Sequence, residues 1–338
     1  PMPGVIGLDI GGVNTKAVWR DGDSVRTVLR PYDVVREREA LTTVVRDVVA
    51  ALAGEPADLI ALTMTAELSD EFRTKREGVG FVLDAVEAAV PGRVLAFTTA
   101  GELVSLAEAR ARPLDVAAAN WVASALAVGA LHPDALMLDV GSTTADVIPI
   151  AAGRVAAAGR NDLDRLLAGE LVYTGALRTN LAAIAPRVPI RGRWCPVASE
   201  LFAISADVHL ILGHLAPEAY TCPTPDGRAA SVEYARERVA RLVCADVEQL
   251  EPGEVERIAA YLHAEQVRQI EVAARQVGTR FAGAPPVVTL GVGAFLARAA
   301  AERLGRPVVE MPWSAAQRDA APAAALAELA AARLGASC

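Results

Sequence analysis

Residues Gly7–Val18 read GLDIGGVNTKAV, and they decide the fold that the sequence predicts. The stretch opens as an apolar strand that carries one acid, Asp9, and a buried carboxylate is costly unless something positive meets it. Gly11 and Gly12 follow, where the chain can turn sharply or let a ligand approach the backbone. We therefore predict a β-hairpin whose tip points N–H groups at a phosphate. Its polar side chains are Asn14, Thr15 and Lys16.

The same pattern recurs in Leu136–Ile150, where Asp139 stands near the end of an apolar run and Gly141 follows it. The hydroxyls of this second turn belong to Ser142, Thr143 and Thr144. A third glycine-rich turn, from Gly291 to Gly293, joins an apolar strand to a helix-forming stretch. A single turn of this kind is a weak signal, because a tight hairpin with a structural Asp produces it too. Two Asp-Gly hairpins in separate halves of the chain, with a late G-x-G turn, are much more specific.

The three turns together resemble those of the actin, Hsp70 and sugar-kinase superfamily. That resemblance implies an α/β fold of the two-lobed, actin-like ATPase (ribonuclease H-like) type, with mixed sheets and a central cleft. We expect an N-terminal lobe over residues 1–130 and a C-terminal lobe over 131–338, with the last helix free to pack back on the first lobe. Asp9 and Asp139 would then face each other across the cleft and hold Mg²⁺ through water, since Mg²⁺ takes hard oxygen ligands and keeps several waters.

Composition limits the partners that we expect. The 338-residue chain has a net charge of −8 and no Lys/Arg run, which argues against nucleic acid. No apolar run reaches the length of a membrane span, and the start lacks a basic-then-apolar signal, so we expect no membrane partner. The cysteines form no C-x-x-C pair, and reduced thiols in a cytoplasmic protein are the simplest account. They are Cys195, Cys222, Cys244 and Cys338. We expect small-molecule partners and consider a homodimer.

Two acids follow the predicted strand over Leu59–Thr65, at the strand end where α/β folds place ligands. They are Glu67 and Asp70, and either carboxylate is a candidate general base. Arg73–Gly78 is predicted as a cationic loop whose Lys75 contacts substrate, with a solvated turn as the alternative.

Three polar residues of the second half are candidates for contacts to substrate or diphosphate: Tyr173, Arg178 and Asp207. Asp207 stands in a predicted helix over residues 200–213. Each of the three has a structural alternative, which is a hydrogen bond to the end of a loop.

His209 and His214 are five residues apart on or near this helix, and that spacing does not place them on one helix face. No third ligand stands at zinc spacing, so we predict no metal site there. His132 and His263 are predicted to be structural.

Short segments between the hairpins narrow the resemblance to one group, the hydantoinase/oxoprolinase-like proteins linked to tetrahydromethanopterin-dependent one-carbon metabolism. The segments cover nearly the whole chain. They are DIGGVNTK (Asp9–Lys16), TMTAELSD (Thr63–Asp70), TKREGV (Thr74–Val79), AANW (Ala118–Trp121), DVGSTTAD (Asp139–Asp146), GELVYTG (Gly169–Gly175), SADVH (Ser205–His209) and TPDGR (Thr224–Arg228). Methanogen members of the group are methanofuran-biosynthesis synthases. They join an aminomethylfuran-methyl diphosphate to the phenol of γ-glutamyltyramine and release diphosphate.

The resemblance implies an alkyl/aryl (non-methyl) transferase of the EC 2.5.1 type with Mg²⁺ as cofactor. Its substrates would be the furan diphosphate and a phenolic amine: tyramine, tyrosine or the γ-glutamyl derivative. The Ala- and Arg-rich composition looks bacterial, where a methylofuran cofactor with tyrosine is an alternative to methanofuran. The catalytic set is Asp9, Lys16, Glu67 and Asp139. The phosphate-binding set is Gly11, Gly12, Asn14, Thr15, Gly141, Ser142, Thr143, Thr144, Gly291 and Gly293. The substrate set is Asp70, Lys75, Tyr173, Arg178 and Asp207.

Two other functions fit the same fold. An ATP-dependent small-molecule kinase or a hydantoinase-like ATPase would use the turn at Gly291 and Gly293 to receive a purine. A non-catalytic nucleotide sensor is the third class, and the acids and the lysine of the two hairpins argue against it.

Overall fold

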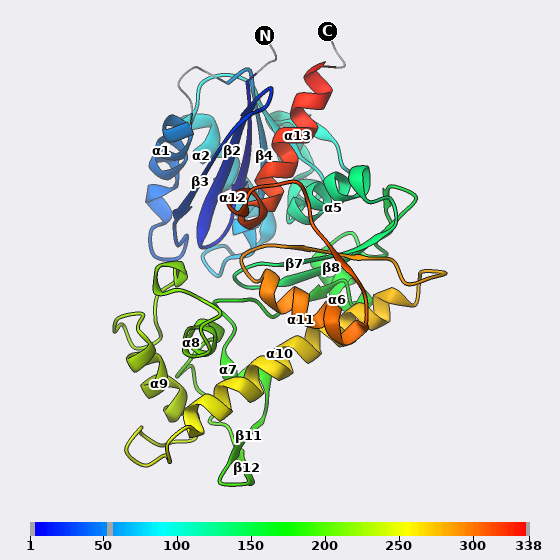
Figure 1. The fold of residues 1–338 in the computed structure, drawn as a ribbon. Coiled ribbons are helices and arrows are strands. Elements are labelled where there is room, and N and C mark those ends of the chain that lie inside the picture. Colours follow the sequence, from blue (N-terminus) through cyan, green and yellow to red (C-terminus); the bar gives the residue numbers. More distant parts are fainter. Residues whose placement is uncertain (1–3, 53–56, 336–338) are drawn as a thin grey trace. The chain divides into compact units, whose positions relative to one another are not determined.

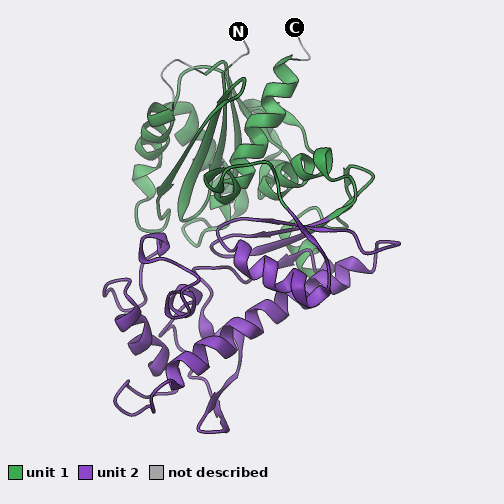
Figure 2. Ribbon diagram, in the orientation of Figure 1, with its two compact units in different colours: residues 1–135, 148–167, 310–338 green, residues 136–147, 168–309 purple. Residues whose placement is uncertain are grey.

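The computed structural model describes residues 4–52 and 57–335 (Figure 1). Helices alternate with strands of mixed sheets, as the α/β prediction requires. The chain forms two compact units (Figure 2). Unit 1 comprises residues 1–135, 148–167 and 310–338, and unit 2 comprises residues 136–147 and 168–309. The predicted boundary at residue 130 is near the end of the first segment of unit 1, but two later segments also belong to that unit.

Unit 1 is built on a mixed sheet of order β3-β2-β1-β4-β5-β6. Its central strand β1 is antiparallel to β2 and parallel to β4. The strands are β1 (Val5–Ile10), β2 (Asn14–Asp21), β3 (Ser24–Pro31), β4 (Leu59–Met64), β5 (Val94–Phe97) and β6 (Leu103–Ser105). The helices are η1 (Arg38–Ala40), α1 (Leu41–Leu52), η2 (Ala66–Leu68), α2 (Lys75–Ala89), α3 (Leu106–Ala111), α4 (Pro113–Val116), α5 (Asn120–Leu131), α6 (Asp162–Ala168), α12 (Ala315–Asp319) and α13 (Ala321–Gly335).

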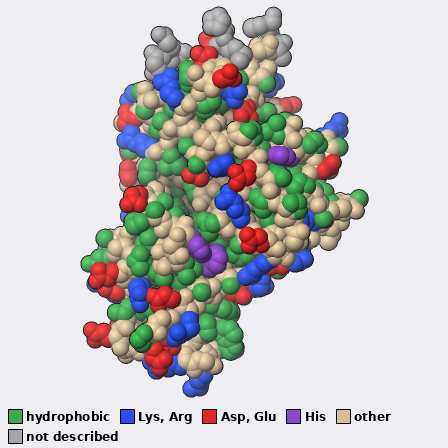
Figure 3. Space-filling view, in the orientation of Figure 1, with side chains coloured by type: hydrophobic (Ala, Val, Ile, Leu, Met, Phe, Trp, Pro, Cys, Tyr) green, Lys and Arg blue, Asp and Glu red, His purple; other side chains and the backbone are tan. Residues whose placement is uncertain are grey.

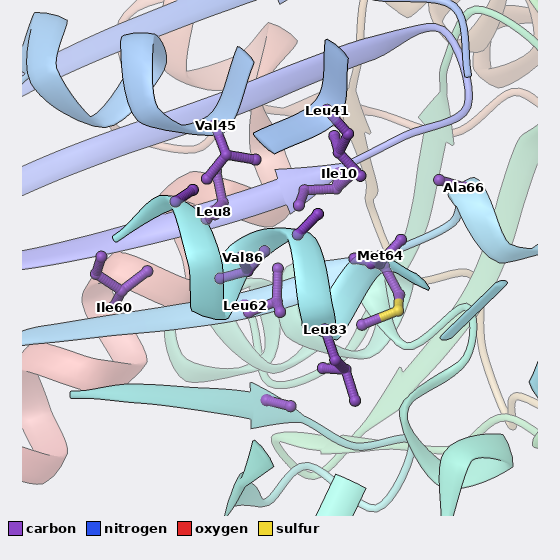
Figure 4. Close-up of a cluster of buried hydrophobic side chains, with 14 of the residues drawn as sticks. Leu8, Ile10, Leu41, Val45, Ile60, Leu62, Met64, Ala66, Leu83 and Val86 are labelled. Atoms are coloured by element: carbon purple, nitrogen blue, oxygen red, sulfur yellow. The ribbon is translucent and has the colours of Figure 1, made fainter. Parts of the chain in front are cut away.

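Both faces of β1 are covered, and all six of its residues are buried. On one face Ile6, Leu8 and Ile10 join a core with α1 and α2, which Figure 4 shows around Val45 and Val86. The buried residues of α1 are apolar and recur at helical spacing. Because side chains alternate along a strand, the remaining β1 residues point to the opposite face.

Helix α13 covers that opposite face at very short range. A Cβ at Gly7 would overlap the carbonyl oxygen of Ala323 in α13, so only glycine fits there. The Ala-rich sequence of α13 makes this approach possible, since its buried residues are nearly all alanine. Helix α13 follows β1 by about 310 residues in the sequence, yet it packs in the same unit against the first hairpin.

The second sheet, most of which belongs to unit 2, has the order β10-β8-β7-β13-β14, with β9 paired to β8. Strand β9 and the last residues of β8 belong to unit 1. Strand β13 is parallel to both β7 and β14, and β10 is antiparallel to β8. The apolar face of β7 and β13 packs against α10 and α11. The strands are β7 (Ala135–Val140), β8 (Ala145–Ala151), β9 (Arg154–Val155), β10 (Leu171–Val172), β11 (Arg187–Ile190), β12 (Arg193–Pro196), β13 (Val287–Leu290) and β14 (Val308–Val309). The helices are α7 (Leu181–Ile184), α8 (Ser205–Ile211), η3 (Pro217–Ala219), α9 (Val232–Arg241), α10 (Glu254–Gly278) and α11 (Ala294–Leu304).

Two predicted elements are corrected by the structure. The predicted loop Arg73–Gly78 is mostly the start of α2, because the Thr74 hydroxyl caps the helix by accepting from Glu77 N. The helical periodicity of residues 103–111 extends over a short strand, β6, and a capping box at Ser105 starts α3. The predicted helix over residues 200–213 is confined to α8.

Among the residues described, no helix combines the length and apolar character needed to cross a membrane. Cys195, Cys222 and Cys244 are free thiols. Cys338 lies outside the described residues.

The close contact between β1 and α13 predicts that adding a methyl group at Gly7 destabilises the fold. Gly7→Ala should lower the free energy of unfolding by about 1–3 kcal/mol or more, because it overpacks the contact with Ala323. Gly80→Ala is the matched control, since nothing lies within 4 Å of a Cβ there and alanine favours the helix by about 1 kcal/mol. Urea unfolding measures both variants. Equal stability of the two would contradict the packing described for α13.

Candidate functional site

The predicted first hairpin is present in unit 1. Asp9 on β1 and Lys16 on β2 are register partners, and Gly11 N donates to Asn14 O at 2.9 Å to close the turn. Two backbone bonds brace the tip from outside, from Tyr32 N to Val13 O and from Val34 N to Gly12 O. The turn is thus fixed by one bond within it and by two bonds from the segment after β3. A Cβ at Gly12 would meet open space, so a ligand can approach the backbone there.

Asp9 is buried on the sheet face that α13 covers, and its Oδ1 has no hydrogen-bond partner. Burial raises its pKa to about 6, although Lys16 works in the opposite direction. Thr63, its register partner on β4, also has a buried hydroxyl without a partner. Unsatisfied buried oxygens are rare in folded proteins and mark places where an ion or water belongs. Oxygen donors of this kind fit Mg²⁺.

Asp319, at the end of α12, joins this group although the sequence did not indicate it. Burial raises its pKa, and the charges of Lys16 and then Arg318 lower it. Lys16 therefore acts on two acids, Asp9 and Asp319, that lie about 310 residues apart in sequence. Asp319 and Lys16 come near each other only in the folded structure, where α12 and α13 belong to the same unit as the first hairpin.

Glu67 lies in η2, directly after β4, and is 1% exposed. Neither carboxylate oxygen makes a hydrogen bond of good geometry, although the backbone N–H groups of Glu67 and Ala118 point toward the carboxylate and lower its pKa. Burial raises its pKa to about 8, while the charge of Lys75 lowers it and that of Asp162 raises it. Gly78 of α2 covers the segment so closely that a Cβ would lie 2.6 Å from the Glu67 Cα. A carboxyl in this state can accept or release a proton near neutral pH.

The ammonium group of Lys75 is already engaged in an ion pair. Its Nζ lies 2.6 Å from Asp162 Oδ2 in a partly buried ion pair. Asp70 is exposed. Next to the ion pair, unit 1 has a groove of about 530 Å³, a volume suited to a small molecule. The groove is lined by Lys75, Thr98, Thr99, Ala100, Glu102, Arg112, Leu114, Asp115, Ala117, Arg160, Asn161 and Leu163.

The second predicted hairpin is present in unit 2. Asp139 stands near the end of β7, and Gly141 N donates to Thr144 O at 2.8 Å to close the turn. The segment at residues 175–178 lies directly on it, since Ala176 N donates to Gly141 O. Leu177 N and Arg178 N both donate to Ser142 O. A Cβ at Gly175 would lie 2.5 Å from the backbone of Ser142 and Thr143.

The late glycine turn packs on the same hairpin. Leu290 of β13 is the register partner of Asp139, so the turn begins beside that acid. Gly293 N donates to Val140 O at 2.8 Å. Gly291 has φ +81°, and a Cβ there would lie 2.6 Å from Asp139 Oδ1. Within unit 2 the structure therefore brings Asp139, the hydroxyl turn and the G-x-G turn together, as the sequence predicts.

The structure revises the prediction that Asp207 contacts substrate. Asp207 is fully buried, and its Oδ1 accepts from Arg238 Nη2 at 2.7 Å and from Tyr220 Oη at 3.0 Å. Its Oδ2 accepts from Ile204 N at 3.0 Å. These bonds give it a structural role in place of the predicted substrate contact. Tyr173 and Arg178 are exposed.

The structure brings together three histidines that the sequence did not group. His209, His214 and His263 each offer a ring nitrogen, and these atoms lie within 4.8 Å of one another. The third residue comes from α10, more than 50 residues later in the sequence, so the spacing of the first two could not reveal it.

The family model of hydantoinase/oxoprolinase matches residues 58–333. The chain belongs to this family. A relative from Methanocaldococcus jannaschii, named (4-{4-[2-(gamma-L-glutamylamino)ethyl]phenoxymethyl}furan-2-yl)methanamine synthase, is 36% identical over 290 residues, which is 86% of each chain. A relative of the same name from Methanococcus vannielii is 32% identical over 163 residues, covering 48% of this chain and 72% of that one.

Solved structures outside the close relatives share the fold. A nucleotide-free structure of acetone carboxylase aligns over 95% of this chain and 70% of its own, with a TM-score of 0.56 and 13% identity. The ethanolamine utilization protein EutJ from Carboxydothermus hydrogenoformans aligns over 97% and 90%, with a TM-score of 0.51 and 16% identity. With the mixed sheets and the two units, this likeness confirms the predicted fold class.

The burial of Glu67 predicts a pH-dependent stability. Its folded-state pKa is raised to about 8, so the folded protein holds a proton that the unfolded chain releases above about pH 4.5. The stabilisation is complete below the unfolded pKa and is lost as pH rises to about 8. Glu67→Gln should therefore gain stability over the parent between pH 6 and 8, by at most about 1.4 kcal/mol per pH unit. Urea unfolding at several pH values measures it.

Asp70→Asn is the control, because it removes an exposed carboxyl of the same loop. Parallel pH profiles for the parent, Glu67→Gln and Asp70→Asn would contradict the raised pKa.

Proposed function

We propose that this chain is a transferase that forms an aryl ether in the biosynthesis of a methanofuran-type cofactor. It would join the phenol of tyramine, tyrosine or a γ-glutamyl derivative to an aminomethylfuran-methyl diphosphate and release diphosphate. The observation that carries the proposal is the 36% identity, over 86% of both chains, to a synthase whose name describes a phenoxymethyl-furan ether. At that identity and coverage, relatives commonly share their reaction type.

The hairpins suit a diphosphate leaving group. In the proposal, backbone N–H groups of the two turns donate to phosphate oxygens, apart from those of Gly11 and Gly141, which close the turns. Lys16 adds a positive charge. We propose Asp9 as a ligand of Mg²⁺ through water, which its unpartnered Oδ1 supports, and Asp139 of the second hairpin for the same role. The ion supplies charge neutralisation of the leaving diphosphate.

In the proposed reaction one carbon–oxygen bond breaks and another forms at the same furan methylene carbon. The bond from the furan methylene carbon to the diphosphate oxygen breaks, and its electron pair leaves with diphosphate. The furan ring stabilises the cation that develops on the carbon, and the phenol oxygen forms the new bond there. We propose Glu67 as the base that takes the phenol proton. The ionised form of Glu67, whose fraction grows as pH rises toward its pKa of about 8, is a stronger base than an exposed carboxylate.

The direct test is product formation with three acceptors. The purified protein with Mg²⁺ and the furan diphosphate should release one diphosphate per ether formed, with tyramine, tyrosine or γ-glutamyltyramine as acceptor. Mass spectrometry detects the ether, and a coupled assay detects diphosphate. Absence of ether with all three acceptors would overturn the proposal. The order of the three rates identifies the natural acceptor.

The ATP-dependent alternative rests on the turn at Gly291 and Gly293, which lies beside Asp139. Isothermal titration separates it from the transferase. The transferase proposal expects no Mg-ATP binding at micromolar concentration, and micromolar affinity would favour the kinase or ATPase.

The proposed metal role of Asp9 predicts a large kinetic effect. Asp9→Asn should lower kcat for diphosphate release by about 100-fold or more, since it removes the charge that holds the ion. Asp21→Asn is the control, because Asp21 is an exposed acid at the far end of β2. A steady-state diphosphate assay compares the two. Undiminished turnover of Asp9→Asn would contradict the assignment.

A further inference from the structure

We propose that His209, His214 and His263 bind one first-row transition-metal ion, with Zn²⁺ as the expected ion, at a site of unit 2. His209 lies on α8, His214 follows that helix, and His263 lies on α10. Their ring nitrogens lie within 4.8 Å of one another. Figure 3 shows His side chains at two separate places on this face of the molecule. The three share no residue with the proposed Mg²⁺ ligands.

Hydrogen bonding fixes the proton of His209. Gln266 Nε2 donates to Gly175 O at 2.7 Å and to Thr174 Oγ1 at 2.9 Å. A carbonyl only accepts, so the orientation of this amide is set and its Oε1 faces His209 Nε2 at 3.0 Å. An amide oxygen also only accepts. Nε2 of His209 therefore carries the hydrogen, and Nδ1 holds a lone pair.

That arrangement is typical of a metal-binding histidine, whose second ring nitrogen donates to a carbonyl or carboxylate. Nδ1 of His209 is buried and has no hydrogen-bond partner, and the same is true of Nδ1 of His263. A buried nitrogen without a partner is unfavourable, because it has lost its hydrogen bonds to water. A shared metal ion would satisfy the lone pair of His209 and one from each of the other two rings.

Ring packing is the alternative explanation of the cluster. Phe295 of α11 lies 4.7 Å from the His209 ring and 5.2 Å from the His214 ring, measured between centroids. Such contacts account for the closeness of the rings. They do not account for two buried nitrogens without partners. Burial also lowers the pKa of His209 to about 3 and of His263 to about 4, so both rings are neutral at pH 7.

The ligand set decides which ions fit. Imidazole suits Zn²⁺, Co²⁺, Ni²⁺ and Cu²⁺, whereas Mg²⁺ and Ca²⁺ take oxygen. Ligands about 2.1 Å from a tetrahedral Zn²⁺ lie roughly 3.4 Å apart, so small side-chain rotations would complete the site. His214 is exposed, which gives the ion a route from solvent and leaves room for water as the fourth ligand.

The site would act on the second hairpin through a short chain of contacts. His209 bonds Gln266, and Gln266 bonds Thr174 and Gly175. Gly175 in turn lies against the backbone of the hydroxyl turn. An ion on His209 would therefore hold in place the segment that packs on that turn.

The test uses the untagged protein, stripped of metal with a chelator, and titrated with Co²⁺ as a spectroscopic probe. We expect one Co²⁺ per chain, with the intense visible bands of a tetrahedral site, and displacement of Co²⁺ by Zn²⁺. His214→Ala and His263→Ala should each weaken binding by about 100-fold or more. His132→Ala is the matched control, since His132 belongs to unit 1 and not to the cluster, and it should bind as the parent does.

Gln266→Ala should weaken binding by about 10–100-fold through loss of the bond to His209. His214 is exposed, so His214→Ala should keep the metal-free fold, and circular dichroism checks this. Binding by His214→Ala and His263→Ala that equals the parent would overturn the proposal. The same holds if the parent shows no tetrahedral Co²⁺ spectrum.

Discussion

A carboxylate buried at the end of β1 is the feature on which unit 1 depends. Asp9 is enclosed because β1 has a helical layer on each side, with α1 and α2 packed on one face and α13 on the other. The second layer requires Gly7, where any side chain would overlap Ala323. Burial without a hydrogen-bond partner raises the pKa of Asp9 to about 6. The site is therefore receptive to a cation, and Lys16 alone supplies only part of the compensation.

Unit 2 contains a second Asp-Gly hairpin, which is supported by different packing contacts from those of the first. Three glycines pack closely on the hairpin around Asp139, two of them against its backbone and one against the side chains of Val140 and Ala176. They are Gly175, Gly291 and Gly293. The histidine cluster lies one further contact away, through Gln266. The two hairpins are thus similar in sequence and differ in the packing that supports them.

Local signals in the sequence predicted both hairpins, the late glycine turn and the fold class. The errors and omissions concern contacts between distant segments. Asp319 and His263 reach their partners only through tertiary folding, so their spacing carries no signal. Asp207 looked like a site residue because an isolated acid on a helix does not reveal that Arg238 pairs with it. Lys75 likewise gave no sign of its partner Asp162.

The central claim is that the furan carbon is the electrophile and diphosphate the leaving group. An acceptor with ¹⁸O in its phenol group tests this most directly, with mass spectrometry of both products. The account predicts that all of the label appears in the ether and none in the released diphosphate. Label in a phosphate product, or a requirement for ATP, would contradict it, because the phenol oxygen would then have attacked phosphorus.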